Sequence, residues 1–140
     1  MIRKLMTVAA LNAALLSGQT LTTAPVAHAD PGVRGCSFTF NKEPYLLHKA
    51  VVVGGTATCT SAPLRFRIEL QLWHRSGTSN PRPKGDTAVV TRIPNPSLHV
   101  ATMALDCVPG MWQGKILMQA TWDTGTNEVR KETAAAIIPC

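Results

Sequence analysis

Two stretches of this chain alternate between apolar and polar residues, and this alternation constrains the fold more than any other feature. In the first stretch, Leu64–Trp73, the apolar phase contains Leu64, Phe66, Ile68, Leu70 and Leu72. In the second, Trp112–Trp122, one phase contains Trp112, Gly114, Ile116, Met118, Ala120 and Trp122, and only Leu117 departs from the pattern. Because successive side chains of a strand point to opposite faces, each stretch predicts a strand with one face on a core.

Five shorter stretches also predict strands, since they are rich in β-branched or aromatic residues. They are Ser37–Phe40, Ala50–Cys59, Thr87–Ile93, Leu98–Asp106 and Lys131–Ile138. Turn-forming residues separate the strands, for example at Asp123–Asn127. Glu128–Ala136 has helix propensity, but its length suits either state. Gly54-Gly55 predicts a β-bulge. Seven short strands in about 110 residues predict an all-β fold, an immunoglobulin-like antiparallel β-sandwich, with an open-ended barrel as the alternative.

The first 29 residues have the layout of a cleaved secretory signal peptide. Arg3 and Lys4 give a charged start, Leu5–Leu16 an apolar stretch, and Ala27-His28-Ala29 a small-x-small cleavage site. The apolar stretch is shorter than the roughly 20 residues of a spanning helix, so we expect no transmembrane anchor after cleavage. Cleavage leaves Asp30–Cys140, or 140 − 29 = 111 residues, which fits a single β-sandwich domain.

Four cysteines lie in the mature part of the chain, and in an exported domain this small they predict two disulfides: Cys36, Cys59, Cys107 and Cys140. Each antiparallel strand reverses direction, so Cys36 and Cys59 fall at one end of the sandwich, and Cys107 and Cys140 share an end. A bridge needs Cα atoms within about 7 Å, whereas a six-residue strand spans roughly 20 Å, which favours the pairs Cys36–Cys59 and Cys107–Cys140. The spacing of Cys59 and Trp73 is close to that in antibody domains and keeps Cys59–Cys107 open as the alternative.

Four short motifs carry a family resemblance. They are Cys59-Thr60-Ser61-Ala62-Pro63, His74-Arg75-Ser76-Gly77, Cys107-Val108-Pro109-Gly110-Met111-Trp112 and the terminal Ile138-Pro139-Cys140. In these motifs the chain resembles small secreted actinobacterial proteins that have four cysteines in this order. The end of the leader, Ala27–Pro31, is similar to those of mycobacterial exported proteins. The resemblance covers nearly the whole mature chain and implies an exported, disulfide-bonded domain, but it implies no catalytic residues.

The sequence offers no recognisable set of catalytic or metal-binding residues. The mature histidines are His48, His74 and His99, and none is spaced for a metal site with another His or Cys. A Cys-x-x-Cys pair, a Gly-x-Ser-x-Gly elbow and a close carboxylate pair are all missing. Without Arg3 and Lys4, 12 basic residues face 8 acidic ones, and a net charge of +4 is too small to predict specific nucleic-acid binding. We therefore expect no catalytic residues, no metal and no cofactor.

Two features predict binding. The loop Arg75–Lys84 is long and polar, carries Arg75, Arg82 and Lys84, and contains two prolines that limit its freedom. Alternatively, it is a solvated connection that keeps an edge strand from pairing. Trp73 is in phase with the charged residues of its strand, which makes it a candidate for carbohydrate stacking or a protein hot spot on the solvent face. The favoured prediction, however, is a core tryptophan, if a bulge shifts the phase.

Together these features predict an exported, non-enzymatic β-sandwich that is secreted by the general route or held at the cell surface. Its partner would be an unknown protein or a cell-envelope ligand. The alternative is a secreted inhibitor of a hydrolase, with Ser76–Gly85 as the inserting loop, and a third hypothesis is a small enzyme. An exposed surface shared by Trp73 and the loop would favour binding, a buried ionisable cluster would favour an enzyme, and a rigid projecting loop an inhibitor.

Overall fold

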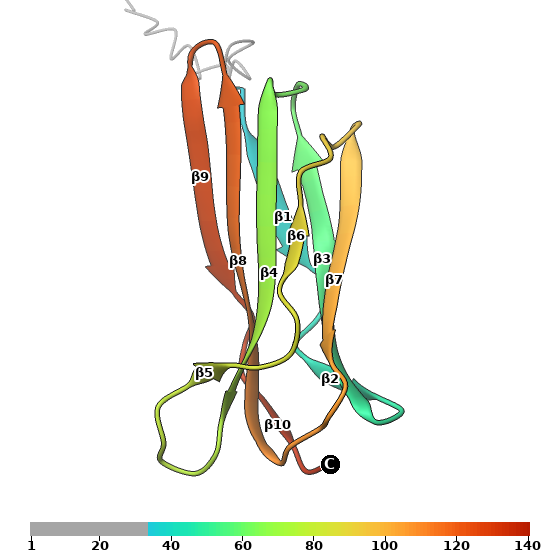
Figure 1. Cartoon of the computed structure of the whole chain (residues 1–140). Helices are drawn as coiled ribbons and strands as arrows, with labels where there is room; N and C mark the ends of the chain where they lie inside the picture. Colours follow the sequence, from blue (N-terminus) through green and yellow to red (C-terminus); the bar gives the residue numbers. More distant parts are fainter. Residues whose placement is uncertain (1–33) are drawn as a thin grey trace, which may run out of the picture. The chain divides into compact units, whose positions relative to one another are not determined.

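The computed structural model describes residues 34–140, and this part of the chain forms ten β-strands and no helix (Figure 1). The strands are β1 (Cys36–Phe40), β2 (Tyr45–Leu47), β3 (Ala50–Cys59), β4 (Arg65–Arg75), β5 (Arg82–Pro83), β6 (Ala88–Val90), β7 (Ser97–Ala104), β8 (Gly110–Trp122), β9 (Gly125–Glu132) and β10 (Ala136–Ile138). Every pairing among them is antiparallel. The predicted all-β antiparallel fold is confirmed, whereas the predicted signal peptide lies outside the described residues.

The strands form two sheets. In the first, β3 is central, with β1 and β2 along one edge and β7 along the other. In the second, β4 and β8 lie side by side, β5 and β6 pair with the other edge of β4, and β9 and β10 with the other edge of β8. The members of each pair β1–β2, β5–β6 and β9–β10 run antiparallel to the same neighbour, so each pair is one interrupted strand. Merging these three pairs reduces the ten strands to seven positions.

The core lies between the two sheets and contains the apolar phases of the two alternating stretches. The largest fully buried side chains are Trp112, Phe38, Ile68, Leu70, Leu72, Met118, Val51 and Val53. Leu64, predicted to share this face, is instead 70% exposed because it precedes the first residue of β4. The strand at the fourth position, β6, pairs with β4 in the second sheet, whereas the fourth strand of an immunoglobulin constant domain belongs to the first sheet. The narrower immunoglobulin-like assignment stays a prediction.

Two disulfides join Cys36 to Cys59 and Cys107 to Cys140, with Cα separations of 4.0 and 5.8 Å. The first bridge links two directly opposed residues of β1 and β3. The second links the segment between β7 and β8 to the residue that ends the chain. The sequential pairing predicted from strand direction is therefore present, and the antibody-like Cys59–Cys107 pairing is not. The strand-direction argument holds because the short β5 runs in the same direction as β6 and adds no reversal.

The bulge predicted at Gly54-Gly55 is wrong. The register of β3 with β7 runs through both glycines without a break, and the register of β3 with β1 reaches Gly55. Gly55 serves close packing instead, because a Cβ there would lie 2.4 Å from the carbonyl oxygen of Thr39 and 2.5 Å from the ring of Phe38. The glycine lets the Phe38 ring approach the backbone of β3.

The last part of the chain departs from the predicted boundaries. Of the turn predicted at Asp123–Asn127, only Asp123 and Thr124 form the turn, and β9 begins at Gly125 with a φ of +139° that suits glycine. The segment with helix propensity is therefore mostly strand. Its side chains are nearly all exposed, so no apolar alternation marks the strand.

Candidate functional site

Trp73 lies on the outer face of the second sheet and not in the core. The register of β4 with β8 is continuous and contains no bulge, so Trp73 keeps the phase of Glu69 and Gln71. Its side chain is partly exposed, whereas Trp112 and Trp122 are buried in the core. The favoured prediction of a core tryptophan at this position is wrong, and the solvent-face alternative holds.

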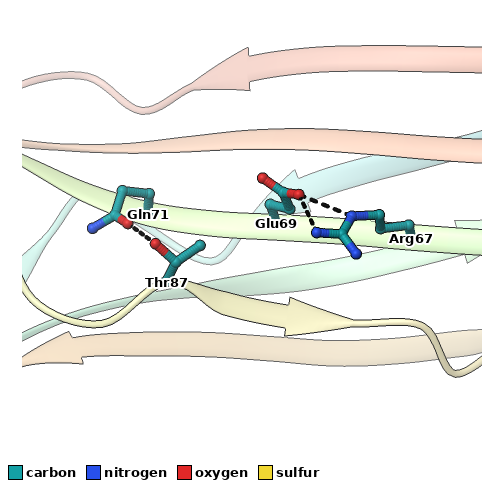
Figure 2. A network of polar contacts seen from close by, with 4 residues as sticks. All are labelled: Arg67, Glu69, Gln71 and Thr87. Atoms are coloured by element: carbon teal, nitrogen blue, oxygen red, sulfur yellow. Dashed lines mark hydrogen bonds and ion pairs between the residues drawn. The ribbon is translucent and has the colours of Figure 1, made fainter.

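The outward side chains of β4, β8 and β9 form rows that cross the three strands. The rows are Arg67 with Gln119 and Glu128, Glu69 with Leu117 and Arg130, and Gln71 with Lys115 and Glu132, and Trp73 lies opposite Gln113 beyond them. Neighbouring rows are about 7 Å apart, two residues along each strand. Figure 2 shows Arg67, Glu69 and Gln71 on β4, with the Thr87 hydroxyl bonded to Gln71 from the segment before β6. Amide, carboxylate and guanidinium groups thus form one continuous polar surface.

Part of this surface is hollowed into a groove of about 570 Å³. We call it the outer groove, and its lining residues are Glu69, Gln71, Trp73, Pro83, Thr87, Lys115, Ile116, Leu117, Arg130, Lys131 and Glu132. Its volume falls within the roughly 300–1,000 Å³ that is typical of small-molecule sites. Trp73 and Pro83 are paired across β4 and β5, and Leu117 follows on β8, so apolar groups stand beside the polar rows.

The ionised side chains of the three rows are paired with one another. Arg67 Nη2 lies 2.6 Å from Glu69 Oε1, Lys115 Nζ lies 3.6 Å from Glu132 Oε2, and Arg130 Nε lies 2.9 Å from Glu128 Oε1. The side chains in these pairs are between 35% and 71% exposed. Three cations and three carboxylates leave this surface with no net charge, and solvent screening keeps each pair weak.

Glu128 is additionally held by an amide. Gln119 Nε2 donates a hydrogen bond of 2.8 Å to Glu128 Oε2. This bond, together with the hydrogen bond from Arg130, lowers the pKa of Glu128 below its ordinary value of 4.5. The carboxylate of Glu128 is therefore ionised throughout the neutral range.

The indole of Trp73 turns a π face toward Lys115. The Lys115 ammonium lies 4.6 Å from the ring centroid, within cation–π distance. Lys115 also lines the outer groove, so the ring face that it covers belongs to the groove. The ammonium is carried on a flexible four-carbon stem, and another group that prefers an aromatic face can displace it.

The four predicted binding residues lie on the paired β4–β5 segment, but they do not all line one site. Trp73 lines the outer groove, whereas Arg75, Arg82 and Lys84 are not among its lining residues. Arg75 Nη2 lies 3.5 Å from the sulfur of Met111, which holds this guanidinium near the sheet.

The loop predicted at Arg75–Lys84 ends earlier than expected. Arg82 and Pro83 return to pair with β4 as β5, and the Lys84 amide donates to the carbonyl of Leu72 at 2.9 Å. The Gln71 side-chain amide also donates to the carbonyl of Lys84, at 3.2 Å. Only residues 76–81 remain as an exposed tip on this clamped base.

Sequence reasoning missed most of the outer groove. Gln71, Lys115, Arg130 and Glu132 occupy the polar phase of their strands, where an ordinary solvated face is the default interpretation. The sequence contained one signal for the groove. Leu117 is the single apolar residue in the polar phase of Trp112–Trp122, and it lines the groove.

Two of the histidines have structural contacts. His74 Nε2 lies 3.1 Å from the Pro109 carbonyl oxygen, and its ring lies 4.7 Å from that of Trp112. His99 Nδ1 lies 2.9 Å from the Thr56 hydroxyl.

Within residues 34–140, no three His, Cys, Asp or Glu side chains are placed to hold a metal ion. The same residues contain no helix long and apolar enough to cross a membrane.

No protein-family model and no curated protein matches the chain. Among solved structures, it is similar to part of a β-glucosidase from Listeria innocua, in complexes with isofagomine and with glucose. The identity is 13% in both cases, and the TM-scores are 0.41 and 0.40. The match covers 76% of this chain but only 17% of the β-glucosidase chain, so it concerns a small part of that protein.

Proposed function

We propose that this protein is an exported, non-enzymatic binding module that holds its ligand in the outer groove. The observation that carries the proposal is the partly exposed indole of Trp73 in the wall of that groove. A large, rigid aromatic side chain contributes more to the free energy of binding than most residues do, because it buries much apolar area at a small entropic cost. The groove is also larger than two other hollows of about 370 and 200 Å³.

The cysteines support an extracellular compartment. Two disulfides, Cys36–Cys59 and Cys107–Cys140, are typical of a protein that matures in an oxidising environment. Together with the predicted signal peptide Met1–Ala29, they support secretion or retention at the cell surface. The ligand would then be an extracellular molecule or a component of the cell envelope.

The charges of the groove favour binding over catalysis. A carboxyl that acts as a general acid needs burial or a neighbouring carboxylate, which keeps it protonated near neutral pH. Glu69 and Glu132 instead lie in contact with solvent, in ion pairs with Arg67 and Lys115, so neither has the burial that a general acid needs.

The experiment measures how much of the purified protein is depleted from solution by insoluble cell-envelope material, for the wild type and two variants. Trp73→Ala removes the indole from the groove. Tyr45→Ala is a matched control on the outer face of the first sheet, because Tyr45 also carries an ammonium over its ring, that of Lys42 at 3.5 Å.

We expect Trp73→Ala to weaken binding about tenfold, the usual scale for an aromatic anchor, and Tyr45→Ala to leave it unchanged. Both residues are only partly buried, so both variants should fold, and circular dichroism checks this. Equal binding by wild type and Trp73→Ala would overturn the assignment of the groove.

A hydrolase inhibitor is the second candidate, and the fixed base of the loop between β4 and β5 favours it. The pairing of β5 with β4 fixes the base of the loop, and the tip at residues 76–81 projects into solvent. Within the tip, the Ser79 hydroxyl donates to the Ser76 carbonyl at 2.7 Å. An inhibitor of this kind would lose potency in a Ser79→Ala, Asn80→Ala double variant and keep it in Trp73→Ala, measured against a panel of secreted hydrolases.

A further inference from the structure

The charge pattern of the outer groove bears on the chemistry of its ligand. A ligand with a net charge would be attracted by one member of each ion pair and repelled by the other, so it would gain little. The three rows are neutral overall and rich in polar groups, and the ammonium of Lys131, which also lines the groove, is bonded to the Phe38 carbonyl at 2.9 Å. Such a surface favours a neutral, polar ligand.

The ion pairs leave hydrogen-bonding capacity unused. Within residues 34–140, both hydrogen bonds from Arg67 to Glu69 go to Oε1, and Lys115 Nζ lies 3.6 Å from Glu132 Oε2. Arg130 contacts Glu128 through Nε, which leaves both of its terminal nitrogens for other partners. Arg130 therefore brings free terminal N–H groups to the groove, and Glu69 brings a free carboxylate oxygen. A hydroxyl group can both donate and accept, so it suits this arrangement better than a pure donor or a pure acceptor.

The Trp73 side chain in the wall of the groove sets a second requirement for the ligand. The negative π face of Trp73 attracts positively polarised groups, and the Lys115 ammonium now occupies this position at 4.6 Å from the ring centroid. A sugar ring presents a face of polarised C–H groups and a rim of hydroxyls. It can take the place of the ammonium on the indole while Lys115 moves to a hydroxyl.

We infer that the ligand of the outer groove is a neutral oligosaccharide, with one sugar ring stacked on Trp73 and the hydroxyls of its other rings bonded to Glu69, Arg130 and Glu132. This inference rests on the proposed function, since it names the ligand of the same groove. A volume of about 570 Å³ is large enough for more than a single small polar group.

The test uses oligosaccharide pairs that differ in charge. Galactotetraose is compared with tetragalacturonate, its anionic counterpart, and tetra-acetylchitotetraose with its deacetylated, cationic form. Each is titrated into the purified protein while tryptophan fluorescence is recorded. Trp112 and Trp122 are buried in the core, so a spectral shift on binding reports mainly on Trp73.

We expect at least one neutral tetraose to shift the emission to the blue and to bind at least tenfold more tightly than its charged counterpart. We also expect Trp73→Ala to weaken that binding about tenfold, followed by calorimetry since the reporter is lost, and Tyr45→Ala to leave it unchanged. Glu69→Gln, which keeps the planar shape but exchanges one acceptor oxygen for a donor, should give an intermediate loss.

Other outcomes separate the inference from the proposed function. If only the charged sugars bind, or if a neutral peptide library yields Trp73-dependent binders and no sugar does, the oligosaccharide inference is overturned while the groove remains a binding site. If a neutral sugar binds equally well to Trp73→Ala, both the inference and the proposed site are wrong.

Discussion

Gly55 lies where the first sheet has no room for a side chain. A Cβ at this position would press on the Thr39 carbonyl oxygen at 2.4 Å and on the Phe38 ring at 2.5 Å. Phe38 is fully buried and Thr39 is held in the β1–β3 ladder, so neither can move freely. Close packing therefore requires a glycine at position 55. The sequence alone could not distinguish this reason for a glycine from the predicted bulge.

Gly55→Ala should lower the free energy of unfolding by about 1–3 kcal/mol through overpacking. The measurement is urea denaturation followed by fluorescence. Gly35→Ala is the control, because no atom lies within 4 Å of a Cβ added there, and it should change stability by less than about 0.5 kcal/mol. A Gly55→Ala protein as stable as the wild type would show that the Phe38 ring can move aside.

The lowered pKa of Glu128 depends first on the Gln119 amide and then on Arg130. Because the folded-state pKa lies below the unfolded one, the stabilisation is present above the unfolded pKa and is lost as the pH falls through the folded one. Gln119→Ala should move the pKa of Glu128 back up toward 4.5, as measured by NMR titration of its carboxyl carbon. Gln113→Ala is the control, since the Gln113 amide donates to Thr133 and not to Glu128. An unchanged Glu128 pKa in Gln119→Ala would assign the whole effect to Arg130.

At the scale of elements, strong alternation predicted well and interrupted strands did not. The buried faces of β4 and β8 could be predicted because every second residue is apolar over a long stretch. The seven strand positions could also be predicted, but β2 and β5 are so short that no pattern marks them. Strand β9 was partly missed because its exposed, charged side chains carry no core signal. These are elements whose existence depends on a neighbouring strand rather than on their own sequence.

The candidate site shows the same limit. Trp73 could be identified as unusual from its phase, but its place on the solvent face needed proof that β4 contains no bulge. The groove around it joins residues of β4, β8 and β9, up to 63 positions apart from Glu69 to Glu132. Such a constellation follows from strand register, which periodicity does not determine.

The two disulfides stabilise elements of different strength. Cys36–Cys59 joins residues that are already paired in the five-residue β1–β3 ladder, whereas Cys107–Cys140 secures the end of the chain beyond the three-residue β10. They close loops with sequence separations of 23 and 33 residues. Removing either bridge should lower the free energy of unfolding by about 3–4 kcal/mol.

We expect a local difference beyond this common loss. The Cys107→Ser, Cys140→Ser double variant should lose hydrogen-exchange protection at the amides of β10 before it unfolds as a whole. In the Cys36→Ser, Cys59→Ser double variant, the amides of β1 should keep the hydrogen-exchange protection that the global stability of this variant allows. Equal protection of β10 with and without its bridge would show that pairing with β8 alone holds the C-terminal strand.

At the scale of the whole domain, the outer faces of the two sheets differ in chemistry. Near the first disulfide, the outer face of the first sheet carries small hydroxyl residues and one imidazole, in the rows Ser37 with Thr58 and Ser97, and Thr39 with Thr56 and His99. The outer face of the second sheet carries an indole, amides, carboxylates and guanidinium groups around the groove. Large planar side chains offer more contact area and more directed hydrogen bonds than small hydroxyls. The first sheet also carries a planar aromatic side chain on its outer face, Tyr45, but Trp73 shares a groove with several polar side chains. The second sheet is therefore the better platform for recognition.

Salt dependence distinguishes the groove from the loop as the binding surface. A neutral ligand beside three rows that carry no net charge does not release or neutralise ions, so its dissociation constant should change less than about twofold between roughly 0.05 and 0.5 M NaCl. Binding through Arg75, Arg82 and Lys84 would instead involve three cations, none of them in an ion pair within residues 34–140, and would weaken steeply over the same range. The measurement is calorimetry with the tightest-binding ligand at several salt concentrations. A loss of affinity of tenfold or more would place recognition on the loop cations and leave the outer groove without the role proposed for it.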